Sequence, residues 1–297
     1  MKQRSPWLLL AAVAVTIAVG VGAYVTRDER AVQNAAVRPV KSNGPQYVAI
    51  GDSFTSGGRI GALQPDGADC LRSSRNYPSL VAKDLGYALR DVSCFGASTK
   101  DVLEGDPAGV PAQVAALSDA TKQVTVSIGG NDLGIFSTMF LTCVRISQPH
   151  SPGAPCRQQF EGRLAAKMLL VSQRVGAVLD KVKELAPNAS VLVVNYLSLM
   201  PQESPCALIP FADRDVLWFA GVEQRLSNAV KSAAEQRDLD VVDAYALSDD
   251  HGICSGRGAW VNGPRPKKLD GLLFHPNGVG ERAIANAIVD RLRDRKP

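Results

Sequence analysis

The stretch Tyr47–Gly58, "YVAIGDSFTSGG", decides the fold that we expect for this chain. Its first four residues are a short apolar run typical of a buried strand. A glycine-flanked turn follows and presents one hydroxyl, that of Ser53, directly after Asp52. Taken alone, the turn fits a helix-capping serine better than a catalytic one.

The same alternation of short strands and helices continues along the chain. Strands are predicted at 47–50, 87–93, 124–128, 191–195 and 240–243. Helices are predicted at 76–86, 111–118, 158–186, 213–238 and 277–294. Strands that alternate with helices predict an α/β fold, in which a parallel five-stranded sheet carries helices on both faces.

Length and charge restrict the function classes. The chain has 297 residues, enough for one large domain over residues 46–297. The net charge of +4 comes from residues 1–45, which leave 27 of 33 basic and 27 of 29 acidic residues to the rest. A neutral domain lacks the positive surface that binding to nucleic acid requires, so we expect no nucleic-acid partner.

The N-terminus predicts export. Lys2 and Arg4 precede an uncharged run, residues 5–26, that is long enough to span a membrane. "VGA" at 21–23 also fits a signal-peptide cleavage site. We expect residues 1–26 to form a single-pass membrane anchor, with a cleaved signal peptide and secretion as the alternative. The basic start keeps the N-terminus cytoplasmic in both cases, and residues 27–45 form a polar linker.

Six cysteines, an even number in an exported chain, predict disulfide bonds rather than a metal site. No Cys-x-x-Cys pair exists and the three histidines are scattered. Long loops are expected at 57–75, 134–157, 198–212 and 246–270, and each holds a cysteine. Pairing in sequence order would pin these loops, but six cysteines allow 15 connectivities. The cysteines are Cys70, Cys94, Cys143, Cys156, Cys206 and Cys254.

Four polar or glycine-rich motifs follow strands or precede the last helix, where parallel sheets form their sites. They are "GDSFTSG" with Ser53, "FGAST" with Gly96, "GGND" with Asn131 and "FHPN" with His275. A serine hydroxyl needs a base to become a nucleophile, and a side-chain amide can stabilise an oxyanion. Each motif alone is weak, but four in this order are specific.

Together these motifs resemble those of the SGNH (GDSL) hydrolase family, over about residues 46–295. The resemblance implies a three-layer α/β/α, flavodoxin-like sheet, and it is strongest to secreted bacterial esterases and lipases with three sequential disulfides. It implies that Ser53 is the nucleophile and His275 the base. The oxyanion hole would combine the N–H groups of Ser53 and Gly96 with the amide of Asn131. No metal or cofactor is implied.

One position departs from the family pattern. Family members commonly carry an aspartate three residues before the histidine, where this chain has Leu272. A backbone carbonyl can also orient an imidazole, so we expect the carbonyl of Leu272 to do so, with Asp270 as the runner-up. Asp52 is expected to cap its turn, and Asp132 to be structural.

The expected function is hydrolysis of acyl or lipid esters by an exported carboxylic ester hydrolase, through an acyl-enzyme. A carbohydrate O-acetyl esterase of the cell envelope, a non-catalytic SGNH-like binding protein and a flavodoxin-like binding module remain alternatives. We expect a monomer that meets the membrane through its N-terminal segment. Residues 135–141 and the aromatic residues of 211–219 would either line an acyl pocket or cover the core.

Overall fold

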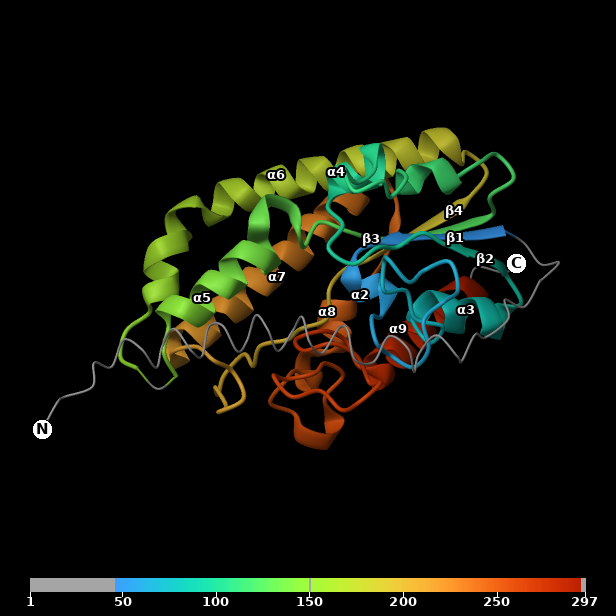
Figure 1. Cartoon of the computed structure of the whole chain (residues 1–297). Helices are drawn as coiled ribbons and strands as arrows, with labels where there is room; N and C mark the ends of the chain where they lie inside the picture. The colour runs from blue at the N-terminus through green and yellow to red at the C-terminus, as the bar shows by residue number, and fades with distance from the viewer. Residues whose placement is uncertain (1–45, 150, 295–297) are drawn as a thin grey trace, which may run out of the picture.

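The computed structural model describes residues 46–149 and 151–294, so the expected anchor and linker lie outside the described residues. Its centre is a five-stranded sheet in the order β2-β1-β3-β4-β5, in which all neighbouring strands are parallel (Figure 1). The strands are β1 (Gln46–Gly51), β2 (Ala88–Asp91), β3 (Gln123–Ser127), β4 (Ser190–Val194) and β5 (Asp240–Val242). All five lie at the predicted positions, within a few residues.

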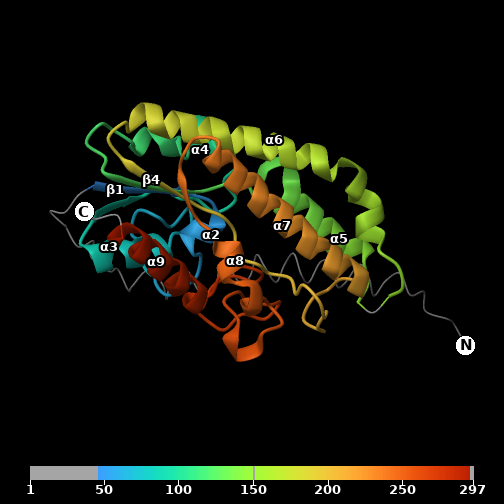
Figure 2. The same ribbon diagram turned by 180° about the vertical axis from the view of Figure 1, so that it is seen from behind.

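Helices cover both faces of the sheet, as the alternation predicts. On one face α3 (Tyr77–Leu85) packs against α9 (Gly278–Arg293), and on the other α6 (Pro155–Leu185) packs along α7 (Asp213–Glu235) (Figures 1 and 2). Shorter helices at the loops are α2 (Ser53–Ser56), α4 (Thr99–Glu104), α5 (Phe140–Ile146) and α8 (Ala244–Leu247). Short 3₁₀ or π turns are η1 (Gln113–Ala116), η2 (Asp132–Gly134), η3 (Ile135–Met139), η4 (Asp249–His251) and η5 (Gly256–Gly258).

The prediction of a helix at 111–118 is wrong, because only the 3₁₀ turn η1 forms there. Pro111 lies just before it, and the few apolar residues between Pro111 and β3 are too short a run for a stable helix. Helices α4 and α5 were not predicted, since each is shorter than two full helical repeats.

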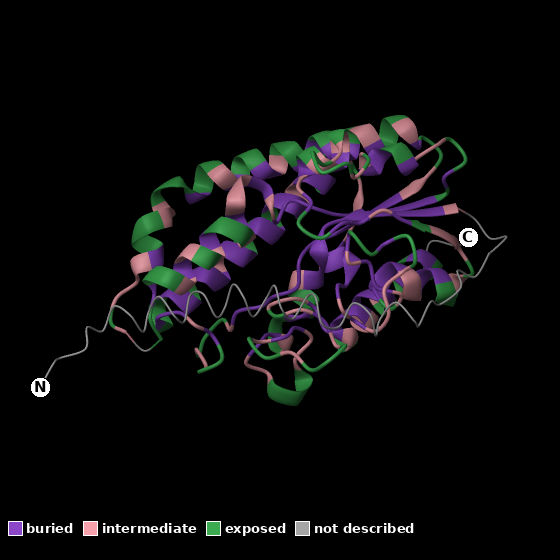
Figure 3. Cartoon of the chain, viewed as in Figure 1, coloured by how far each residue is buried: buried purple, intermediate pink, exposed green. Residues whose placement is uncertain are grey.

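The strand order determines where a site can form. The chain leaves β1 toward β2 on one side and returns to β3 on the other, so a crevice opens at the carboxyl ends of β1 and β3. Strands β1 and β3 are almost wholly buried between the helical layers (Figure 3). Loops that leave these strand ends are therefore held on a rigid base.

Three disulfides pin the long loops, and their pairing follows sequence order: Cys70–Cys94, Cys143–Cys156 and Cys206–Cys254. The first joins the loop after α2 to the loop after β2. The third joins the loops that follow β4 and β5. Within residues 46–149 and 151–294, no helix is both long and apolar enough to cross a membrane.

Candidate active site

Ser53 is presented by a capped turn at the end of β1. Asp52 is the N-cap of α2, and its Oδ1 accepts a hydrogen bond from the N–H of Phe54 at 3.0 Å. Gly57 ends this short helix in the left-handed conformation. The expected capping role of Asp52 is thus seen in the structure, and Ser53 occupies the first helical position.

His275 meets Ser53 from the other end of the chain. Its Nε2 lies 2.9 Å from Oγ of Ser53, although 222 residues separate the two. The serine and the imidazole are therefore in hydrogen-bond contact, as removal of the hydroxyl proton requires. The alternative hypothesis, a flavodoxin-like binding module without catalysis, predicts that these two residues are not in contact.

A backbone carbonyl orients His275, but it is not the one predicted. Nδ1 of His275 lies 2.9 Å from the carbonyl oxygen of Leu273, whereas the carbonyl of Leu272 accepts from the amide of Asn262 at 3.2 Å. Asp270 is not the orienting group either, because its Oδ1 accepts from the N–H of Gly278 at the start of α9. Phe274 has φ +56°, so the chain reverses locally and brings the later carbonyl to the ring.

Asn262, which the sequence analysis missed, clamps the loop that carries His275. Its N–H donates to the carbonyl of His275 at 2.8 Å, and its carbonyl accepts from Phe274 at 3.0 Å. Its side-chain amide donates to the carbonyls of Asp270 and Leu272. Asn262 thus forms four hydrogen bonds with the backbone of this loop.

Aromatic rings surround the imidazole. Phe95 stacks on His275 at 5.7 Å between ring centroids, and Phe54 contacts it at 5.3 Å. This partly dry environment lowers the pKa of His275 below its usual value, because burial disfavours imidazolium, while the hydrogen bond to the Leu273 carbonyl acts in the opposite direction. The ring therefore stays neutral, and able to accept a proton, at lower pH than an exposed histidine.

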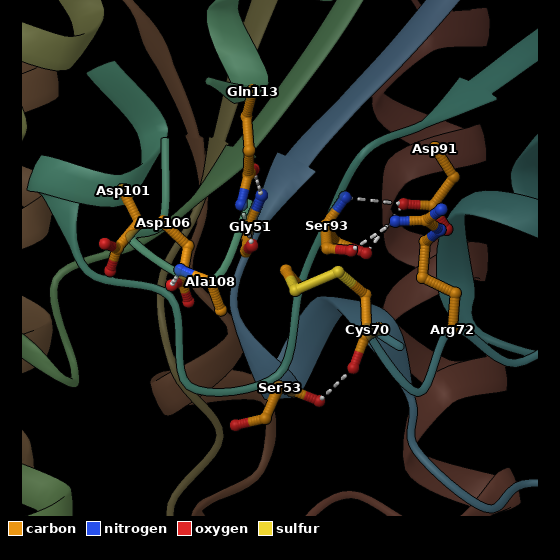
Figure 4. The surroundings of a disulfide bond; sticks show 12 residues. Gly51, Ser53, Cys70, Arg72, Asp91, Ser93, Asp101, Asp106, Ala108 and Gln113 are labelled. Atoms are coloured by element: carbon orange, nitrogen blue, oxygen red, sulfur yellow. Dashed lines mark hydrogen bonds between the residues drawn. A yellow bond between two sulfur atoms is a disulfide. The ribbon is translucent and has the colours of Figure 1, made fainter. Parts of the chain in front are cut away.

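Gly96 lies in the turn after β2, which the first disulfide ties to the loop after α2 and which a backbone hydrogen bond ties to β1. The N–H of Cys94 donates to Gly51 at 3.0 Å, and the N–H of Phe95 donates to the carbonyl of Cys70 at 3.1 Å. The Cys70–Cys94 bond lies beside Gly51 and Ser53 (Figure 4). Gly96 has φ +80°, a conformation that favours glycine. Within the described part of the chain, the N–H groups of Gly96 and Ser53 have no hydrogen-bond acceptor.

Asn131 lies at the carboxyl end of β3, and its amide donates to the carbonyl of Ala97 at 3.0 Å. Its neighbour Asp132 is structural, as expected. The carboxylate accepts from the N–H and hydroxyl of Thr99, at 2.9 and 2.6 Å, and from Arg174 at 3.2 Å. These bonds hold the Gly96 and Asn131 turns together.

Gln113 is a further residue that sequence reasoning missed. It is buried in η1, and its side-chain amide both donates to and accepts from the backbone of Gly51, at 2.9 Å each (Figure 4). This amide thus supplies an acceptor for the N–H of Gly51 beyond the end of β2, and the carbonyl of Gly51 accepts from both Gln113 and the N–H of Cys94. No local pattern in the sequence signals such a contact.

Most of the apolar residues considered for an acyl pocket cover the core. Ile135, Met139, Phe211, Trp218 and Phe219 are buried. The exceptions are Phe136, which stacks on Phe54 at 5.7 Å, Phe140, which is partly buried, and Leu141, which is 61% exposed. Phe54 and Phe95 contact His275 directly, and Phe95 is exposed at the rim of the site.

A serine–imidazole contact at the switch point of a parallel sheet, beside unpaired N–H groups, is typical of serine hydrolases. Residues 49–283 match the GDSL-like lipase/acylhydrolase family, and the chain belongs to that family. It is a carboxylic ester hydrolase of the SGNH type. The resemblance noted from the sequence is thereby confirmed.

Individual relatives agree. Lipase 2 of Streptomyces coelicolor is 32% identical, over 83% of this chain and 85% of that protein. An esterase of Streptomyces scabiei is 29% identical over the same shares. The crystal structure of phospholipase A1 from Streptomyces albidoflavus, 26% identical, covers 85% of this chain and 100% of its own, with a TM-score of 0.70. The expected three-layer, flavodoxin-like architecture is confirmed.

Proposed function

We propose that Ser53 and His275 hydrolyse carboxylic esters through an acyl-enzyme. The observation that carries this assignment is the 2.9 Å contact between Ser53 Oγ and His275 Nε2. Nε2 takes the hydroxyl proton while Oγ attacks the ester carbonyl, and the resulting imidazolium then protonates the leaving alcohol. In the second half His275 takes a proton from water as the water oxygen attacks the acyl carbonyl. The bond to Oγ then breaks, His275 returns the proton to Oγ of Ser53, and the acid is released.

The oxyanion is met by the N–H groups of Ser53 and Gly96 and by the amide of Asn131. Neither N–H group has an acceptor among the described residues, and the Asn131 amide has a second N–H besides the one that donates to the carbonyl of Ala97. Donors of this kind, held in place before the reaction, stabilise charge as it develops, and the loss of one costs about 100- to 1,000-fold in rate.

The test is hydrolysis of p-nitrophenyl esters by the full chain and by Ser53→Ala, which we expect to lower kcat by roughly 10⁴- to 10⁶-fold. His275→Ala is compared with His251→Ala, because His251 is occupied elsewhere, 2.7 Å from the carbonyl of Gly258. Equal activity of wild type and Ser53→Ala would remove Ser53 from the mechanism. If hydrolysis depends on Ser53 but is unchanged in His275→Ala, then His275 is not the general base.

The proposed substrates are acyl or lipid esters. The support is the aromatic wall of Phe54, Phe95 and Phe136, together with the lipase and phospholipase names of the relatives. A series of p-nitrophenyl esters of increasing chain length tests this, and we expect kcat/KM to rise beyond acetate. A maximum at acetate would instead favour an O-acetyl ester of a carbohydrate.

The proposed location is outside the cytoplasm, where disulfides persist. Three disulfides support it, as does the similarity in fold to an extracellular lipase from Streptomyces rimosus, with a TM-score of 0.68. We further propose that residues 1–26 anchor a monomeric domain to the membrane. Release of the protein into the medium with an N-terminus near residue 24 would show cleavage instead.

A further inference from the structure

We propose that Tyr196 is a positioning residue of this site, whose phenol hydroxyl joins the turn that carries Ser53 to the turn that carries Asn131. The inference rests on the proposed roles of Ser53 and Asn131. It concerns how the nucleophile and the oxyanion donors are held at a constant separation.

Tyr196 follows β4, so its ring enters the same edge of the sheet as the Ser53 and Asn131 turns. The side chain is 1% exposed. Its hydroxyl accepts a hydrogen bond from the N–H of Gly130 at 2.7 Å and donates one to Oδ2 of Asp52. Gly130 directly precedes Asn131, and Asp52 directly precedes Ser53. One oxygen atom therefore connects the two turns.

The ring itself is held in place by packing. Tyr196 meets Phe54 edge-on at 5.3 Å and Phe136 at 5.5 Å. A Cβ on residue 130 would lie 2.9 Å from Cζ of Tyr196, so only glycine allows this approach. The hydroxyl cannot drift without moving one of the two turns, because the tyrosine contacts both Phe54, next to Ser53, and Gly130, next to Asn131.

Loss of the hydroxyl would leave two buried polar groups unpaired: the N–H of Gly130 and Oδ2 of Asp52. Such groups are costly without a partner, so we expect both turns to shift toward other donors and acceptors. A displacement of about 1 Å at a catalytic group is enough to cost on the order of 100-fold in rate. The loss falls on the chemical step, because Tyr196 is buried beneath the site.

Asp52 supplies a second readout. Burial raises its pKa to about 7, the hydrogen bond from Tyr196 lowers it, and the negative charge of Asp132 raises it. Tyr196 and Asp132 are the titratable groups that face it, and Asp132 is itself paired with Arg174. Removal of the Tyr196 hydroxyl therefore raises the pKa of Asp52 further.

The experiment compares Tyr196→Phe with Tyr47→Phe in the full chain. Tyr47 is the matched control. It is the second residue of β1, at the end of the strand away from the site, and its side chain is fully buried. Its hydroxyl oxygen lies 2.8 Å from Oγ1 of Thr125. We expect kcat of Tyr196→Phe for a p-nitrophenyl ester to fall by about 10- to 100-fold with KM within threefold. Tyr47→Phe should keep both parameters within twofold.

The pH profile separates positioning from a general loss of stability. In the wild type we expect an inflection near pH 7 from Asp52, and in Tyr196→Phe this inflection moves to higher pH while that of His275 stays in place. Equal kcat in Tyr196→Phe and Tyr47→Phe, or an unmoved inflection near pH 7, overturns the proposal. If Ser53→Ala abolishes hydrolysis in the same preparation, only the inference about Tyr196 fails.

If Tyr196→Phe does not fold, Asp52→Asn tests the same link. Its Oδ1 still accepts from Phe54, but an amide replaces the carboxylate oxygen that accepts from Tyr196. We expect a fall in kcat with little change in KM. Wild-type kcat in this variant contradicts the proposal.

Discussion

The carbonyl oxygen of Leu273 lies 2.9 Å from Nδ1 of His275, two residues further along the chain. The imidazole is thus oriented by a neutral dipole rather than by a carboxylate. A carbonyl selects the tautomer in which Nε2 is free to take a proton, but it stabilises imidazolium less than a full negative charge does. This arrangement leads to a prediction for the aspartate nearest in sequence.

Asp270→Ala should leave kcat and kcat/KM within about threefold of the wild type. Its Oδ1 accepts from the N–H of Gly278 at 2.9 Å, so the variant loses a contact at the start of α9, worth about 1 kcal/mol of unfolding free energy. Ester hydrolysis and thermal unfolding measure the two effects. Asp270→Asn, which keeps an acceptor oxygen, is the control for stability. A loss of kcat above 100-fold in Asp270→Ala would show that this carboxylate acts in catalysis.

The pKa of His275 predicts the acid limit of activity. Burial lowers this pKa below 6.5, so the ring is still neutral at a pH where an exposed histidine is protonated. The acid limb of kcat/KM should therefore have its midpoint below pH 6.5, which rate measurements from pH 4.5 to 9 would reveal. A profile with no inflection below pH 6.5, apart from the inflection near pH 7 that we expect from Asp52, would contradict the lowered pKa of His275.

The disulfides should differ in their effect on catalysis. Cys70→Ser/Cys94→Ser should lower both the free energy of unfolding and kcat, because Cys94 precedes the Gly96 turn by two residues. Cys206→Ser/Cys254→Ser is the matched comparison, in which we expect a loss of stability with kcat nearly unchanged. By restricting the unfolded chain, each disulfide adds about 3–4 kcal/mol to the free energy of unfolding in the chain-entropy model. Denaturant unfolding and ester hydrolysis of both pairs provide the measurement, and equal kcat in the two pairs would contradict the link to Gly96.

Stability should fall as the pH rises through the neutral range. Glu223 is buried, and burial raises its pKa to about 8, although its Oε2 accepts from the N–H groups of Leu199 and Met200. The folded protein therefore keeps a proton that the unfolded chain releases above its ordinary pKa of about 4.5. Between these values the unfolded state is favoured increasingly, so the free energy of unfolding declines with pH, by a few kcal/mol in order of magnitude.

The variant Glu223→Gln is the control for this pH dependence of stability. Glu223→Gln removes the ionisable group while keeping an acceptor for the two N–H groups, so its free energy of unfolding should vary less between pH 5 and 8. Denaturant titrations at several pH values measure the slope. Identical slopes in wild type and Glu223→Gln would assign the pH dependence to other buried acids, such as Asp91 and Glu281, whose pKa values are also raised.

Much of the fold follows from local patterns. The β-branched runs predicted β1, β3 and β4, because a strand buried on both faces needs an unbroken apolar segment. The edge strands β2 and β5 are only partly buried, and the run that predicted β2 is weaker. The amphipathic runs predicted α3, α6, α7 and α9 for a similar reason. The prediction of a helix at 111–118 is wrong, because Pro111 and the short apolar run after it allow only a 3₁₀ turn. The periodicity of apolar residues does not distinguish such a turn from the first turn of an α-helix.

The sequence by itself determined which residues lie at the strand ends and before the last helix. Ser53, Gly96, Asn131 and His275 each occupy a turn that local chemistry identifies, and a parallel sheet brings such turns to one edge. Tertiary structure alone decided the partners that hold them: the Leu273 carbonyl behind His275, the Gln113 amide on Gly51, and the Tyr196 hydroxyl between Gly130 and Asp52. The last two join residues 62 to 144 positions apart. Such contacts leave no periodic trace, because hydrogen bonds depend on distance and direction in space rather than on spacing along the chain.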